Sequence, residues 1–181
     1  MAFIIKFVSH LNLKGGLPLL EIAKIHTISN MIMMLLPHRD LFFQTQIHTT
    51  DEIFYSPKTP FEIIKELIIS HNYSTYEGRR KAIVAKWKLY QNTPIPIDHR
   101  RFICAIPTHS PHTWDCTWLF YKNIAYIEKD DNNRAIVYFC NGDNITLSIS
   151  AYQMKLQWRK AGNLLAQMML EDFHNDFHND F

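Results

Sequence analysis

The basic side chains of this sequence are concentrated in one segment. Between positions 79 and 101 there are seven basic residues and one acidic residue, so the segment carries +6 while the whole chain carries only +2. The basic residues are Arg79, Arg80, Lys81, Lys86, Lys88, Arg100 and Arg101. Clustered cations bind phosphate backbones through counterion release, whatever the base sequence. The segment therefore indicates a polyanionic partner, although most such clusters are simply the solvated face of a helix.

Two further features favour the polyanion interpretation. Aromatic residues accompany the cluster at Tyr73, Tyr76, Trp87 and Tyr90, and the acids that would pair with exposed lysines are nearly absent from it. The negative charge lies elsewhere, with four carboxylates between positions 171 and 181. A basic patch with a separate acidic tail indicates a polyanion partner rather than an overall electrostatic character.

A second group, Cys104, His109, His112 and Cys116, is a candidate zinc site. The spacing C-x4-H-x2-H-x3-C offers two thiolates and two imidazoles within thirteen residues, which is sufficient for tetrahedral coordination. However, no C-x2-C pair is present, and apolar residues alternate around Cys104 as they do around a buried strand residue. We therefore expect no bound metal, and a zinc-binding module or metalloenzyme is the alternative function.

Common motifs of catalysis do not occur in the sequence. G-x-S-x-G, H-E-x-x-H, the Walker A motif and G-x-G-x-x-G are missing, and the carboxylates are scattered. We therefore expect a protein that is not an enzyme and that uses no cofactor.

Three helices are predicted to position these residues. Thr59-Pro60-Phe61-Glu62 combines an N-cap hydroxyl, a proline in the first turn and a glutamate three residues after the cap, and begins a helix over about 60–72. A second capping pattern, Ser74-Thr75-Tyr76-Glu77, begins a helix to about Tyr90 that carries most of the basic cluster. A third helix, capped at its start by a serine and a glutamine, covers about 150–170.

The other apolar runs have the two-residue period of strands. The prolines of 93–97 require an extended chain, and Asn141-Gly142 is a strong hairpin signal because both residues tolerate positive φ. The predicted strands cover 27–36, 41–48, 102–106, 116–128, 135–140 and 144–149. The sequence therefore predicts an α+β fold, an antiparallel β-meander packed on one face with about three helices in a single domain.

The composition is that of one folded domain in a reducing compartment. The chain has 181 residues, of which 47% are hydrophobic and 20% charged. Three cysteines are too few for a disulfide framework, and no apolar run approaches the roughly 18 residues of a membrane span, so we expect a cytoplasmic protein with no membrane contact. We assign 1–24 to an N-terminal extension, 25–170 to the domain and 171–181 to a low-complexity acidic tail.

Five short motifs follow one another along the chain: Tyr76-Glu77-Gly78-Arg79-Arg80, Thr93-Pro94-Ile95-Pro96-Ile97, Pro107-Thr108-His109-Ser110-Pro111, Cys116-Thr117-Trp118 and Phe139-Cys140-Asn141-Gly142. In this order they resemble the bacterial competence transcription factor family, ComK. The resemblance covers about 25–170. The first 24 residues and the Asp-Phe-His-Asn repeat that follows Leu170 depart from the family pattern.

The resemblance implies a transcription activator that turns on genes for DNA uptake in Gram-positive bacteria. Members of the family bind paired A/T-rich boxes through the minor groove, as dimers that assemble further, and an adaptor delivers them to a Clp-type protease. The partners implied for this chain are double-stranded DNA, further copies of itself and such an adaptor. A degenerate relative that acts by protein pairing alone is another alternative.

This mode of binding suggests roles for the basic residues. The narrow minor groove of A/T tracts has a deep negative potential that attracts arginine, so we expect Arg79 and Arg80, beside Gly78, to enter it. The other basic residues are expected to contact phosphates or extend the footprint, namely Lys81, Lys86, Lys88, Arg100 and Arg101. In the alternative interpretation, Arg79 or Arg80 is structural and pairs with Glu77 or with a buried carboxylate.

Overall fold

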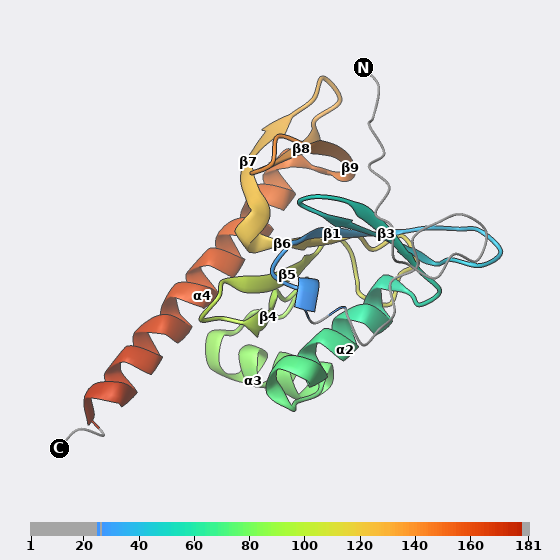
Figure 1. The fold of residues 1–181 in the computed structure, drawn as a ribbon. Helices are drawn as coiled ribbons and strands as arrows, with labels where there is room; N and C mark the ends of the chain where they lie inside the picture. The colour runs from blue at the N-terminus through green and yellow to red at the C-terminus, as the bar shows by residue number, and fades with distance from the viewer. Residues whose placement is uncertain (1–24, 26, 179–181) are drawn as a thin grey trace.

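The computed structural model describes residues 25 and 27–178, which form two antiparallel sheets and three long helices (Figure 1). The first sheet has the strand order β3-β2-β1-β6-β5-β4, and the second has the order β7-β8-β9. The strands are β1 (Ile32–Pro37), β2 (Thr45–Thr49), β3 (Ile53–Ser56), β4 (Ile95–Asp98), β5 (Ile103–Pro107), β6 (Trp118–Phe120), β7 (Ile124–Lys129), β8 (Arg134–Phe139) and β9 (Asn144–Ser150). The helices are α2 (Pro60–Asn72), α3 (Tyr76–Trp87) and α4 (Ala151–His178), with a 3-10 turn, η1 (Tyr121–Asn123).

The strands β5 and β6 of the six-stranded sheet are buried on both faces. Successive side chains of a strand point to opposite faces, and along β5 Ile103 and Ala105 join one apolar cluster while Cys104 and Ile106 join another. The first cluster contains the buried side chains of α2 and α3, and the second contains those of β7, β8, β9 and most of α4. The α+β class is confirmed, but the helices do not share one face because α4 packs with the second sheet.

The local signals of the sequence are confirmed at α2 and at the β8–β9 hairpin. The Thr59 hydroxyl accepts a hydrogen bond from the Glu62 N–H at 3.2 Å, and the Glu62 carboxylate accepts one from the Thr59 N–H at 2.8 Å. Asn141-Gly142 connects β8 to β9, and of these two residues Gly142 has a positive φ, +91°. Both signals act within a few residues, so tertiary packing does not alter them.

Several strand predictions are wrong in detail. The strands predicted over 27–36 and 41–48 begin only at Ile32 and Thr45, because a helical turn precedes the first and a turn closed by the Asp40 carboxylate precedes the second.

The predicted strand over 116–128 is divided by η1, where the Asn123 side-chain amide donates to the Ile32 carbonyl at 2.6 Å and the chain passes from one sheet to the other. The four residues of β3 were not predicted, although they pair with β2 at the edge of the large sheet. So short a strand has too few residues to show a period.

Helix α4 is longer than predicted. It does not end near Leu170 but continues to His178, so most of the expected acidic tail is helical, and it projects past the other elements in Figure 1. A long preceding helix already supplies the nucleus for these last turns. In the part of the chain that the structure describes, no helix is long and apolar enough to span a lipid bilayer.

Candidate nucleic-acid interface

The start of α3 sets the direction of the first basic side chains. Thr75, rather than Ser74, is the N-cap, and its hydroxyl accepts a hydrogen bond from the Gly78 N–H at 3.1 Å. A side chain on Gly78 would crowd this cap, because its Cβ would lie 3.2 Å from the same oxygen. The Ser74 hydroxyl instead accepts a hydrogen bond from Nε of Arg79 at 3.3 Å.

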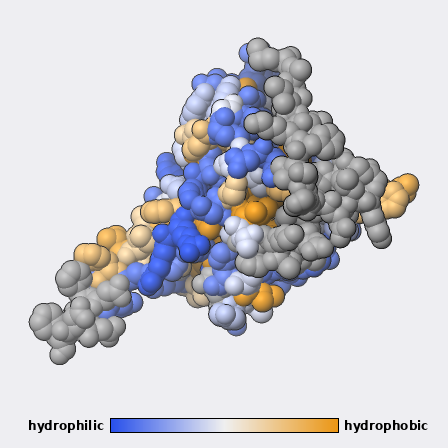
Figure 2. All heavy atoms as spheres, in the orientation of Figure 1, coloured by the Kyte–Doolittle hydropathy of each residue, from blue (hydrophilic) through white to orange (hydrophobic). Residues whose placement is uncertain are grey.

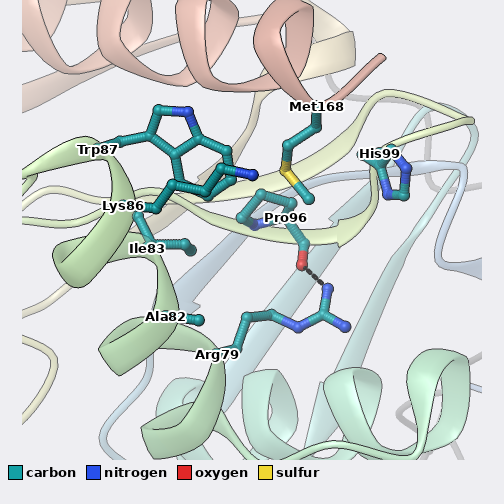
Figure 3. A pocket seen from close by; sticks show the side chains of 8 residues that line it. All are labelled: Arg79, Ala82, Ile83, Lys86, Trp87, Pro96, His99 and Met168. Atoms are coloured by element: carbon teal, nitrogen blue, oxygen red, sulfur yellow. Dashed lines mark hydrogen bonds between the residues drawn. The ribbon is translucent and has the colours of Figure 1, made fainter. Parts of the chain in front are cut away.

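Arg79 connects α3 to β4. Its side chain is half-buried, and Nη1 donates a hydrogen bond to the main-chain carbonyl of Pro96 (Figure 3). Burial lowers the pKa of this guanidinium, and the charge of Asp98 partly opposes that effect. Arg79 is thus tied to β4 through a carbonyl oxygen and not through the carboxylate of the structural alternative, and its side chain is only partly exposed.

The residues before Arg79 are also structural. Tyr76 is buried, with its ring at 4.8 Å from that of Phe61 in an edge-to-face contact, and burial raises its pKa to about 12. Glu77 forms a 3.5 Å ion pair with Lys65 of α2. The first residues of the Tyr-Glu-Gly motif therefore fix α3 against α2.

Three of the seven basic residues are exposed on α3 and at its C-cap, Lys88, whose left-handed backbone ends the helix before the predicted Tyr90. Arg80, Lys81 and Lys88 are exposed, and no carboxylate of the described chain forms an ion pair with any of them. Nη2 of Arg80 donates to the Tyr90 carbonyl at 3.1 Å, and Nζ of Lys88 donates to the Ala85 carbonyl at 2.8 Å. Their charges are thus uncompensated, which is the state that a phosphate backbone requires.

The other basic residues have acidic partners. Lys86 pairs with Glu171, and Arg100 with Asp172 at 2.9 Å, so both are held by α4. Arg101 lies 3.6 Å from Asp98. Hydrogen bonds from His99 and then Arg100 lower the pKa of Asp172, so its carboxyl is ionised at neutral pH. In Figure 2, strongly hydrophilic side chains gather where α4 passes the body of the molecule.

A hollow of about 250 Å³ lies between α3, β4 and α4 (Figure 3). Its floor is apolar, and Arg79, Lys86 and His99 stand at its edge. The apolar lining residues are Ala82, Ile83, Trp87, Pro96 and Met168. Each of these three side chains already has a hydrogen-bond partner in the protein. Lys86 and His99 find theirs on α4, and Met168 of α4 lines the hollow, so the hollow is part of the contact that seats α4.

The candidate zinc ligands do not come together. Cys104 belongs to the apolar cluster on one face of the large sheet, and Cys116 belongs to the cluster on the other face. His112 packs edge-to-face on Phe61 at 5.1 Å, and Nδ1 of His109 lies 3.0 Å from the hydroxyl of its neighbour Thr108. Among the described residues, no group of three or more metal-ligating side chains is present. The zinc hypothesis for this quartet is therefore wrong, because the sheet separates its two thiols.

The same burial predicts a large difference in thiol reactivity. Burial raises the pKa of the Cys104 thiol, and raises that of Cys116 to about 11, whereas Cys140 is exposed. Because the thiolate is the reactive form, we expect Cys140 to be alkylated at least about 100-fold faster than the other two at pH 8. Mass spectrometry of protein quenched during alkylation measures this, with labelling in denaturant as the control. Equal rates for all three thiols in the folded protein would contradict the burial described.

Three residues that contact the basic side chains were not identified as site residues from the sequence. His99, Glu171 and Asp172 join α4 to the basic residues, across 72 to 85 positions of sequence. The separation of charge into a basic segment and an acidic tail was the available signal, because two such segments of one chain attract each other.

The fold and this surface define a single-domain α+β protein with uncompensated cations along one short helix. The chain belongs to the ComK family, since the family model described as ComK protein matches residues 23–172. The protein is therefore placed among competence transcription factors. Searches of curated proteins and of solved structures each found no match to the chain.

Proposed function

We propose that this protein activates genes for DNA uptake by binding A/T-rich promoter boxes through the minor groove. The observation that carries the proposal is the exposure of Arg80 and Lys81 on α3, and of Lys88 at its C-cap, without an ion-pair partner in the described chain. Membership of a competence transcription factor family supports DNA as the polyanion.

Within this proposal Arg80 is the side chain that enters the groove. Arg79 is engaged with the Pro96 carbonyl, whereas Arg80 is exposed and donates a hydrogen bond to the main-chain carbonyl of Tyr90. The guanidinium suits the narrow, strongly negative groove of A/T tracts, and the exposed ammonium groups of Lys81 and Lys88 are suited to the phosphates beside it. Paired boxes require two copies of this surface, so we propose that a homodimer is the unit that binds.

Binding through the minor groove is tested with DNA duplexes that present the same minor groove and different major grooves, or the reverse. Replacing A·T by inosine·cytosine pairs keeps the minor-groove pattern of A·T and changes the major groove, whereas G·C adds an amino group to the minor groove. We expect the A/T and inosine·cytosine duplexes to bind alike, and the G·C duplex to bind at least about tenfold more weakly. Fluorescence anisotropy at several salt concentrations measures the affinities, and sedimentation of the complex gives the number of protein chains.

The outcomes separate the candidate functions. Tight binding to the A/T duplex but not to the inosine·cytosine duplex would show that the protein recognises bases in the major groove, and would contradict the proposal. A stable dimer that binds none of the three duplexes at low salt would identify a regulator that acts by protein pairing alone.

A further inference from the structure

Residues 171 and 172 of α4 lie against basic side chains that the sequence predicts to contact phosphates. Glu171 contacts Lys86 of α3, and Asp172 contacts both His99 and Arg100 in the connection between β4 and β5. The latter two distances are both 2.9 Å. Two adjacent carboxylates of one helix therefore neutralise cations from two other elements.

These ion pairs are weak enough for phosphates to replace the carboxylates. The side chains of Lys86 and Arg100 are 54% and 69% exposed, so water competes for both ends of each pair and the net free energy of each is small. A phosphate backbone offers the same cations many acceptors and releases counterions when they bind, which the carboxylates of α4 cannot do. A polyanion therefore has the means to displace the carboxylates, and until it does they lower the local positive potential.

We propose that the acidic turn of α4 is an intramolecular competitor that occupies Lys86 and Arg100 in the free protein and reduces its affinity for a nucleic-acid backbone. The inference rests on the proposed function and adds an autoinhibitory contact to it. Arg80, Lys81 and Lys88 make the first contacts, and Lys86 and Arg100 become available only when α4 releases them.

The test removes the two charges and keeps the shape of the helix. The variant Glu171→Gln with Asp172→Asn is compared with Glu128→Gln and Asp131→Asn, which changes the net charge equally. Glu128 and Asp131 are exposed and lie in and beside β7, at the opposite end of the molecule from α3 in Figure 1. We expect the α4 variant of the full chain to bind the A/T duplex about tenfold more tightly than the wild type, and the control about twofold at most.

Elution from immobilised heparin, a sulfated polyanion, is the second measurement. It keeps the inference testable if the proposed function fails, because heparin needs cations and no base sequence. Later elution of the α4 variant than of the control supports the competition even if neither protein binds DNA. Unchanged or weaker binding of the α4 variant to both polyanions, with an unchanged melting temperature, would overturn it, since Glu171 and Asp172 would then only position the cations.

Discussion

Replacing Arg80 and Lys81 by glutamate is expected to weaken binding to the A/T duplex by at least about 100-fold. Removing one basic contact to DNA costs about 1–3 kcal/mol, and a carboxylate in its place adds repulsion from the phosphates. Both side chains are exposed on α3, and neither forms an ion pair within the described chain. The hydrogen bond from Arg80 to the Tyr90 carbonyl lies at the surface, where water replaces the donor, so we expect the fold to be kept. Fluorescence anisotropy gives the affinity, and the far-ultraviolet circular dichroism spectrum checks the fold.

The matched control for this variant is Lys129→Glu with Lys155→Glu. These lysines are exposed on β7 and in the first turns of α4, far from α3 in Figure 1, and their reversal changes the net charge by the same amount. Because salt screens charges beyond about 10 Å, we expect the control to lose no more than about threefold in affinity. An equal loss in both variants would show that affinity follows the net charge of the protein and not the exposed residues of α3.

Arg79 is left unchanged in this experiment for a structural reason. Its guanidinium donates to the Pro96 carbonyl and to the Ser74 hydroxyl, which connects α3 to β4 and to the turn before the helix. A glutamate at this position would place a half-buried carboxylate against a carbonyl oxygen, and would leave both acceptors without their donor. Lost DNA binding in such a variant would report a disturbed fold.

Trp118→Ala is expected to destabilise the protein by about 3–5 kcal/mol and to lower its melting temperature by roughly 10 °C. Trp118 is completely buried in β6, in the middle of the large sheet, where its ring is stacked with Phe61 at 6.3 Å and meets Tyr76 edge-to-face at 6.4 Å. Its removal leaves a cavity between the sheet and the helices that carry those rings. Urea and thermal unfolding, followed by circular dichroism, measure the loss.

Trp114→Ala is the comparison for this substitution. Trp114 is 67% exposed, and its main contact is the guanidinium of Arg39, 3.6 Å above the ring. Such an exposed cation–π contact is worth about 0.5–1 kcal/mol, so Trp114→Ala should unfold close to the wild type. Trp118→Phe should lie between the two, because Nε1 of Trp118 has no hydrogen-bond partner within the described chain. Similar melting temperatures for the two alanine variants would contradict the packing described for the large sheet.

Much of the secondary structure was predictable because its signals are local. The reciprocal hydrogen bonds of Thr59 and Glu62 begin α2 as predicted, and Asn141-Gly142 turns the chain between β8 and β9. The proline-rich segment before Asp98 is extended in β4, since its prolines exclude a helix. Each of these signals depends on residues at most a few positions apart, which the linear sequence displays directly.

The sequence predicted the basic segment of the candidate site, but not which of its side chains are exposed. The sequence indicates which residues are basic, but Arg79 and Arg80 are adjacent and chemically identical, and nothing local distinguishes them. Adjacent helical residues point about 100° apart, so one of them faces β4 and the other faces solvent once α3 is packed. The two thiols of the candidate zinc site were likewise separated by the sheet, whose faces the spacing of cysteines does not reveal.

The amino-acid sequence alone was sufficient for the family resemblance, the fold class and the concentration of positive charge, because motifs, periodicity and charge are properties of neighbouring residues. Only the packed molecule decided which cations are exposed, which are tied to the backbone, and which are covered by Glu171 and Asp172 of α4. Those contacts join residues up to 85 positions apart, and they form because helices and sheets bury their apolar faces together, which brings distant charges into reach of one another.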